Sequence, residues 1–304
     1  MRAFLLITLA LAAGASAQTN VHLKDGRILA AKGLRRDKDT IVATLEIPAK
    51  EPGGVPTKGD FGFPLADIFR LEFPKPPVLD AAPDLIADGK AAEALGNLDA
   101  ALKYYAGFRD APGSWWVELV PLQVEALLAL RRDKEAGDVA EQFSRLSPDP
   151  EVKKFFKAFT AVVLTRKGEH QAALPLYDEA ALATERTDIL GLIAVNKGES
   201  LIGLADALAA KGEPEAAAVR YEEALLSFLR IPALYRTQRM FMAPATYGAA
   251  QAYLGMRDFD RARQAVKELT TSYAATPEAK ATAELTQKIE KRAALLAAPA
   301  TEKK

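Results

Sequence analysis

The sequence has no cysteine and only two histidines, His22 and His170, among its 304 residues. Without cysteine there is no disulfide and no cysteine nucleophile, so packing alone must stabilise the fold. Two histidines in different regions supply too few ligands for a histidine-based metal site, and we expect His170 to be an ordinary surface residue. Lys+Arg and Asp+Glu are both 40, so there is no basic excess to favour nucleic acid as the main partner.

Known catalytic motifs are also missing. The sequence has no Gly-x-Ser-x-Gly elbow, no phosphate-binding glycine-rich loop and no His-Glu-x-x-His helix. Carboxylate pairs such as Glu222-Glu223 fall on a helix face that we expect to be solvated. The sequence therefore predicts no catalytic residue, no metal and no cofactor, and it favours a protein that is not an enzyme.

Only the first residues form an apolar run with the flanks of a targeting signal. Arg2 gives a positive start, residues 4–13 are apolar, and Ala15-Ser16-Ala17 has the small-x-small pattern of a cleavage site. This pattern predicts a secretory signal peptide over residues 1–17. A membrane anchor is the alternative, but a span needs about 20 apolar residues. Because a lipoprotein anchor requires a cysteine after the cleavage site, we expect a periplasmic or secreted protein without an integral membrane segment after cleavage.

Residues 18–74 have the alternating pattern of short strands. Residues 21–29 alternate around the turn dipeptide Asp25-Gly26, and residues 41–47 alternate again. Two more alternating runs follow a loop at residues 48–60 that is rich in Pro, Gly and Lys. Four or five short strands predict a small antiparallel barrel or curled sheet of the SH3 or Sm kind, which we call the β-module.

The rest of the chain is helical in its composition and period. Residues 75–80 are rich in proline and predict a stiff linker. Residues 81–275 are rich in Ala, Leu, Glu and Lys, so the fold class is α+β but mainly α. Thr276-Pro277 has the cap and first-turn proline of a helix start, which predicts a capping helix over residues 276–296. We expect residues 297–304 to form a disordered tail.

Two segments of the helical region superimpose without gaps. Each has a glycine turn, a small residue five positions later and an aromatic residue four positions beyond that. The residues are Gly168, Ala173 and Tyr177 in one segment and Gly212, Ala217 and Tyr221 in the other. The glycine closes one helix, the alanine permits close approach of the next helix, and the tyrosine fills the space beside it. This self-similarity predicts an array of helical repeats.

The pattern resembles the tetratricopeptide repeat (TPR) family, whose second helix opens in the same way. Further matching positions are Gly96, Ala101, Tyr105, Ala136, Ala205, Ala250 and Ala262. The small residues at 101, 136, 173, 217 and 262 are 35, 37, 44 and 45 residues apart, against a family period of 34. The two long intervals require longer helices or an inserted loop. The resemblance implies about five repeats in an α-solenoid with a concave groove.

In this family the concave groove binds peptides or partner proteins. The resemblance therefore implies an exported protein-binding scaffold, for example in cell-envelope assembly, although the TPR fold names no partner. Two alternatives stay open. The β-module is the ligand-binding part and the helices are its platform, or the protein is an envelope hydrolase or an accessory to one, which clustered buried carboxylates would favour.

Candidate partner-binding residues come from three places. Residues 229–242 break the repeat pattern and combine arginine, aromatic and methionine side chains, a mixture typical of interfaces; packing between repeats is the alternative. Of the neighbours Trp115 and Trp116, one is expected in the core and the other at the surface. The concave groove supplies the third group. The full set is Arg230, Tyr235, Arg236, Arg239, Phe241, Ile202, Asp206, Gln251 and Trp116.

The predicted signal peptide gives a direct test. N-terminal sequencing of the protein from its native cells is expected to begin at Gln18, because cleavage follows the small residue Ala17. Recovery of a cytosolic chain that still begins at Met1 would contradict export.

Overall fold

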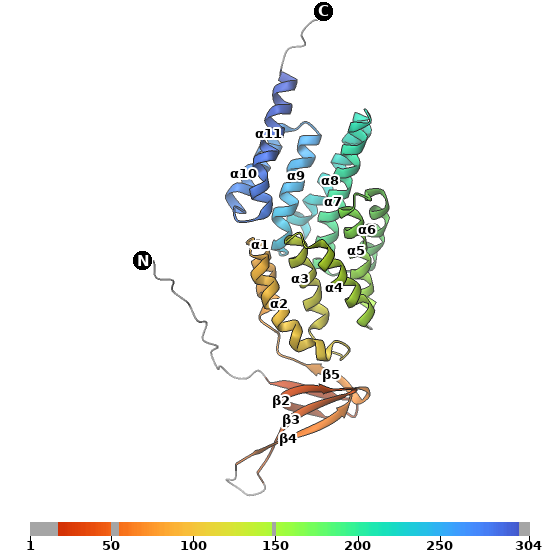
Figure 1. The fold of residues 1–304 in the computed structure, drawn as a ribbon, viewed down its shortest axis with the longest axis vertical. Coiled ribbons are helices and arrows are strands. Elements are labelled where there is room, and N and C mark those ends of the chain that lie inside the picture. The colour runs from red at the N-terminus through yellow and green to blue at the C-terminus, as the bar shows by residue number, and fades with distance from the viewer. Residues whose placement is uncertain (1–17, 50–54, 148–149, 298–304) are drawn as a thin grey trace, which may run out of the picture. The chain divides into compact units, whose positions relative to one another are not determined.

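The computed structural model describes residues 18–49, 55–147 and 150–297, and the chain divides into two compact units (Figure 1). Unit 1 contains the N-terminal sheet and residues 105–115. Unit 2 contains residues 76–104 and everything described from Trp116 onward. The predicted signal peptide, the centre of the predicted loop 48–60 and all but the first residue of the predicted tail lie outside the described residues.

Unit 1 is built on a five-stranded antiparallel sheet with the strand order β4-β3-β2-β1-β5. The strands are β1 Thr19–Leu23, β2 Ile28–Asp37, β3 Thr40–Ile47, β4 Thr57–Pro64 and β5 Ile68–Glu72. The predicted Asp25-Gly26 turn joins β1 to β2, and Gly26 has a φ of 88° there, which glycine adopts without strain. A short 3-10 turn, η1 (Leu65–Asp67), connects β4 to β5.

The predicted barrel is wrong, because the sheet is open. β4 and β5 are its two edges, and within the described residues neither pairs with the other. The free edge of β5 is instead used by a later segment: the backbone N–H of Leu71 donates to the carbonyl oxygen of Pro112 at 2.7 Å. Gly113 allows this approach, because at its φ of 85° an added Cβ would collide with the carbonyl oxygen of Leu71.

Residues 105–115 complete the core of unit 1. The ring of Phe73 packs edge-on against Tyr105, with 5.3 Å between the ring centroids, and Trp115 donates its indole N–H to the Phe73 carbonyl at 3.3 Å. Arg36 on β2 makes two hydrogen bonds of 3.2 Å to Asp110. A sheet of this size is near the lower limit for an independent core, and the inserted segment enlarges it. Unit 1 therefore extends beyond the predicted residues 18–74.

Unit 2 consists of five helix–turn–helix pairs followed by one further helix. The pairs are α1 Val78–Ala87 with α2 Ala91–Tyr105, α3 Trp116–Ala129 with α4 Asp133–Leu146, α5 Pro150–Arg166 with α6 His170–Ala183, α7 Thr187–Ala210 with α8 Pro214–Leu234, and α9 Met242–Gly255 with α10 Phe259–Ser272, and α11 is Pro277–Ala297. The 3-10 turn η2 (Ala106–Phe108) follows α2, and η3 (Arg239–Phe241) precedes α9. No helix in the described ranges is both long and apolar enough to cross a bilayer.

All five pairs are joined by the same turn. Each turn holds one residue in the left-handed conformation, with φ between 59° and 81°; these residues are Gly89, Arg131, Gly168, Gly212 and Arg257. The next residue donates its N–H to the carbonyl five positions earlier, at 2.8–3.0 Å in all five turns. This is the Schellman arrangement, which satisfies carbonyls at the end of the first helix and sets the start of the second.

A buried alanine follows each turn at the same distance. These residues are Ala94, Ala136, Ala173, Ala217 and Ala262, and none is more than 2% exposed. In each case the alanine N–H donates to the carbonyl of the residue that begins the second helix's first turn. The aromatic residue four positions later is also buried in two pairs, as Tyr177 and Tyr221. The ring of Tyr221 packs against Gly255 of α9, where an added Cβ would lie 2.5 Å from the ring.

The first repeat has a different register from the predicted one. Gly96 stands inside α2, Ala101 is only partly buried, and Tyr105 ends that helix. The turn lies at Gly89, whose φ is 75°, and Ala94 takes the buried place. Gly89 and Gly96 are seven residues apart, close to two helical turns, so the apolar pattern fits either register.

The irregular spacing of the repeats has separate causes. The buried alanines are 42, 37, 44 and 45 residues apart. The first interval contains residues 105–115, which belong to unit 1. The third reflects long helices, since α7 has 24 residues and α8 has 21. The fourth combines the long α8 with the turn η3.

Successive helical pairs pack against one another, and α1 also contacts η3, the turn that connects the fourth pair to the fifth. α5, α7, α9 and α11 contact one another in order, and α1 packs against α3 and η3. Arg239 of η3 lies 2.6 Å from Asp84 of α1 and 3.3 Å from Asp88, which directly follows α1. An added Cβ on Gly89 would lie 2.5 Å from the carbonyl oxygen of Ala275, in the α10–α11 turn. The N-terminal pair is therefore seated on later parts of unit 2.

α11 covers the last pair. Thr276 precedes it and its hydroxyl accepts a hydrogen bond from the N–H of Ala279 at 3.2 Å, while Pro277 occupies the first helical position. Leu285 and Ile289 of α11 are buried in one cluster with residues of α9 and α10. Such a helix supplies the apolar surface that another repeat would otherwise have provided.

The alanine contact can be tested with a substitution at two neighbouring positions. Ala173→Leu is expected to lower the free energy of unfolding by about 1–3 kcal/mol, because the added carbons overpack the contact between two helices. Ala172→Leu, at the adjacent exposed position, is expected to change it by about 0.5 kcal/mol or less. Urea unfolding followed by circular dichroism measures both, and equal losses for the two variants would contradict this register.

Candidate functional site

Three of the predicted partner-binding residues lie in the interior. Trp116 is buried, with its ring centroid 4.9 Å from that of Phe143 on α4. Ile202 of α7 is buried as well. Phe241 is buried with its ring against Gly191 of α7, where an added Cβ would lie 2.5 Å from the ring. These three predictions need correction, because the side chains fill space between helices and present no surface to a partner.

The remaining arginines of residues 229–242 have different environments. Arg239 is paired with two carboxylates, Asp84 of α1 and Asp88 at its C-terminal end, so its charge serves contacts within unit 2. Arg230 and Arg236 are exposed, and Tyr235 is partly buried at the end of α8. The segment therefore contacts α1 through Arg239, and its Arg230 and Arg236 are exposed with no ion pair to another described residue.

The predicted concave-groove residues do not form a common site with these cations. Asp206 on α7 is exposed, but it accepts a hydrogen bond from the hydroxyl of Tyr221 in the same helical pair. Burial and this contact both raise the pKa of the Tyr221 hydroxyl. Gln251 lies partly buried on α9. Asp206 thus acts within its own pair, and only Arg230 and Arg236 of the predicted set remain exposed without such a contact.

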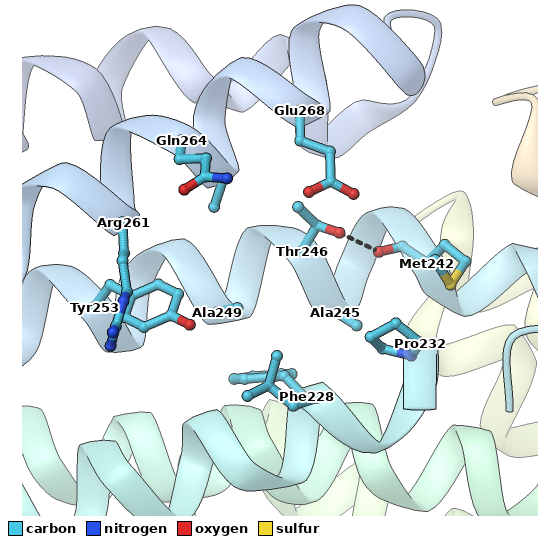
Figure 2. Close-up of a pocket in the computed structure, with 12 residues that line it drawn as sticks. Phe228, Pro232, Met242, Ala245, Thr246, Ala249, Tyr253, Arg261, Gln264 and Glu268 are labelled. Atoms are coloured by element: carbon cyan, nitrogen blue, oxygen red, sulfur yellow. Dashed lines mark hydrogen bonds between the residues drawn. The ribbon is translucent and has the colours of Figure 1, made fainter. Parts of the chain in front are cut away.

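A groove lies beside residues 229–242 that the sequence did not reveal. It has a volume of about 320 Å³ and lies between α8 and α10, with α9 packed against both helices (Figure 2). Its lining residues are Phe228, Leu229, Pro232, Met242, Ala245, Thr246, Ala249, Tyr253, Arg261, Gln264, Ala265 and Glu268. Three of them, Leu229, Pro232 and Met242, belong to the segment that the broken repeat pattern had singled out.

Small residues create the floor of this groove. Ala245 and Ala249 of α9 are buried, and their single methyl groups line the groove between α8 and α10 (Figure 2). Phe228 of α8 is also withdrawn from the surface, because its ring packs where Cβ atoms on Gly198 and Gly248 would otherwise lie. A valine or leucine at any of these glycines or alanines would fill the groove or push the ring back into it.

Polar side chains form the rim on the α10 side. Arg261, Gln264 and Glu268 follow one another at intervals of three and four residues, so they share one face of the helix. The Arg261 guanidinium lies 5.8 Å from the centroid of the Tyr253 ring and 3.3 Å from the helix-capping Asp258. Thr246 directs its hydroxyl to the carbonyl of Met242 at 2.9 Å (Figure 2).

α8 carries several exposed apolar side chains, of which Leu229 lines the groove. Leu226 and Leu229 are 60% and 40% exposed, and Val219 and Leu234 are exposed as well. An apolar floor bordered by charged and amide groups is the usual composition of a protein-binding surface.

Charged side chains of α3, α5 and α7 interact with one another outside the groove lining. The pKa of Glu125 on α3 is raised to about 8. Burial is the main cause and the negative charge of Asp188 on α7 adds to it, while the positive charge of Arg166 on α5 opposes both. Burial also raises the pKa of Glu278 on α11, and the positive charge of Arg131 only partly opposes this shift. A carboxyl group protonated near neutral pH is what a general acid needs, but none of these groups lines the groove.

The described residues contain no cluster of metal ligands, and His170 packs against a neighbouring helix. Within the described ranges, no three His, Asp or Glu side chains are grouped to hold a metal ion. The prediction of a surface His170 is wrong, because this first residue of α6 is partly buried and its ring lies where an added Cβ on Gly203 of α7 would collide with it. Its role is therefore packing between α6 and α7.

Comparison with known proteins adds no family assignment. No protein-family model matches the chain, and no curated protein matches it.

The environment of Glu125 predicts a pH-dependent stability. Because its pKa is about 8 in the folded protein and ordinarily 4.5, the folded state keeps a proton that the unfolded state has released between these values. Its stabilising contribution is complete below pH 4.5 and is lost as the pH rises to about 8. Between pH 5 and pH 8.5 the free energy of unfolding of wild type is therefore expected to fall by about 1–3 kcal/mol more than that of Glu125→Gln, because glutamine has no proton to lose.

Urea titrations at the two pH values measure this difference. The exposed Glu222→Gln is the matched control and is expected to follow wild type at both values. Parallel curves for wild type and Glu125→Gln would show that this carboxyl group does not keep its proton on folding.

Proposed function

We propose that this protein is a non-catalytic, exported scaffold that binds a peptide segment of a partner protein in the groove between α8 and α10. The observation that carries the proposal is the groove itself, with its volume of about 320 Å³, its apolar floor and its charged rim. The groove is bordered by Leu229, which is 40% exposed, and by polar side chains of α10, a composition that suits a protein segment.

We further propose that the helical pairs are repeats of TPR type. Support comes from the five equal turns, each with a left-handed residue and a buried alanine at the same distance beyond it. Families of this kind bind partners on surfaces built from several helices. In this chain the groove over α9 is a better candidate than the predicted concave residues, because Ile202 is buried and Asp206 is bonded within its pair.

The site of action that we propose is the periplasm or the extracellular space, with a role in cell-envelope assembly. Support for export comes from the charged start, apolar run and small-residue cleavage pattern of residues 1–17. The absence of cysteine in all 304 residues fits a protein whose stability does not depend on the redox state of its compartment.

A second candidate places the binding surface on the sheet. Ile28, Phe61 and Phe69 of unit 1 are exposed, Phe69 by 67%. Expressing the two units separately does not test this candidate. Residues 105–115 belong to unit 1, but in the sequence they follow residues 76–104 and precede Trp116, which belong to unit 2. A substitution such as Phe69→Ser tests it in the full chain.

The groove is tested with peptides selected on the purified protein. Random dodecapeptides displayed on phage are selected for binding, synthesised with a fluorescent label and titrated by anisotropy. Gln264→Trp is expected to weaken their binding by about tenfold or more, because the indole occupies the groove. Lys267→Trp, on the same helix but outside the groove lining, is expected to bind within about twofold of wild type.

Two outcomes would contradict the groove as the binding site. Unchanged affinity in Gln264→Trp, with a circular dichroism spectrum like that of wild type, would exclude it. Loss of binding in Phe69→Ser but not in Gln264→Trp would transfer the function to the sheet.

A further inference from the structure

The rim of the groove carries two opposite charges at a defined spacing. Arg261 and Glu268 both line the groove and are seven residues apart on α10, which is about 10 Å along a helix axis. Figure 2 shows them on the same side of α10, with Gln264 between them. A ligand that satisfies both must present a negative and a positive group at that separation.

Both charged groups are available to a ligand. The side chain of Arg261 is 64% exposed, and its contact with Asp258 involves one terminal nitrogen, so other N–H donors remain. Glu268 is exposed, and its carboxylate has no hydrogen bond or ion pair within the described residues. The stacking of Arg261 on Tyr253 holds its planar group at the rim, where it can bind a carboxylate through two hydrogen bonds.

The length of the groove matches a short helix. Its lining on α9 runs from Met242 to Tyr253, a rise of eleven residue steps or about 16 Å, which equals three helical turns. A bound helix has the same rise per residue as α10, so two of its residues seven positions apart come opposite Arg261 and Glu268 together. The residues three and four positions after the first charge lie on the same face of the bound helix, between the two charged residues and next to the groove floor.

We propose that the occupant of the groove is a three-turn amphipathic helix of a partner protein. It carries an acidic residue opposite Arg261, a basic residue seven positions away opposite Glu268, and two apolar residues between them. This inference rests on the proposed function and names the chemistry of its partner. Charge complementarity fixes the register of the helix, and the apolar residues contact the floor and Leu229.

Defined peptides test the inference. Two stapled sixteen-residue helical peptides carry Leu at the two central positions and either Glu then Lys, or Lys then Glu, seven positions apart. A third carries Gln at both charged positions. One of the two charge orders is expected to bind the wild-type protein about tenfold more tightly than the other, and the Gln peptide is expected to fall between them.

The decisive measurement is the double reversal Arg261→Glu with Glu268→Lys. Because the charges of the rim exchange places, this variant is expected to prefer the opposite peptide order by a similar factor. The matched control Lys267→Glu with Thr270→Lys changes two exposed residues of α10 outside the groove lining and is expected to keep the wild-type preference. Circular dichroism spectra establish that all variants are folded.

The outcomes separate this inference from the proposed function. If the helical peptides bind and Gln264→Trp blocks them, but the double reversal leaves the preference unchanged, the groove binds and the charge pairing is overturned. If the phage-selected peptides bind in the groove but no helical peptide does, the helical occupant is overturned. If analytical ultracentrifugation finds a dimer that Gln264→Trp dissociates, the occupant is a second copy and the inference is also overturned. If no peptide depends on Gln264, both the inference and the proposed function fail.

Discussion

The close approach of two helices at a buried alanine is the contact on which unit 2 depends. In every pair a left-handed turn residue and its Schellman hydrogen bond fix where the second helix begins, and the alanine five residues after the left-handed residue is buried. Because the alanine side chain is a single methyl group, the backbones come close enough for larger side chains on either side to interlock. The turn and the alanine must therefore occur together, and each is of little use alone.

The same use of small residues explains the groove. Gly198 and Gly248 allow the ring of Phe228 to pack deep between α7 and α9, and Ala245 and Ala249 keep the outer face of α9 low. Larger residues at these positions would have filled the space between α8 and α10 with the protein's own side chains. The hollow thus follows from the packing that joins the fourth and fifth pairs, and its shape is set by the core beneath it.

Local patterns predicted the parts of the fold that local interactions determine. The turns at Gly168 and Gly212 were found because glycine, alanine and tyrosine recur there at equal distances. The first repeat was misplaced because two glycines lie about two helical turns apart, and only the left-handed backbone at Gly89 distinguishes them. The assignment of residues 105–115 to the sheet depends on tertiary contacts with Leu71 and Phe73, for which the sequence of the segment carries no periodic signal.

The predicted site shows the same division. The broken repeat period drew attention to residues 229–242, but composition alone could not separate the packed side chains of this segment from its exposed ones. Phe241 and Arg239 turn toward α7 and α1, whereas Leu229, Pro232 and Met242 line the groove. One segment therefore both seats the N-terminal helix and forms one end of the groove. Because η3 is held by α1 on one side and leads directly into α9 on the other, the position of the groove floor is tied to the docking of α1.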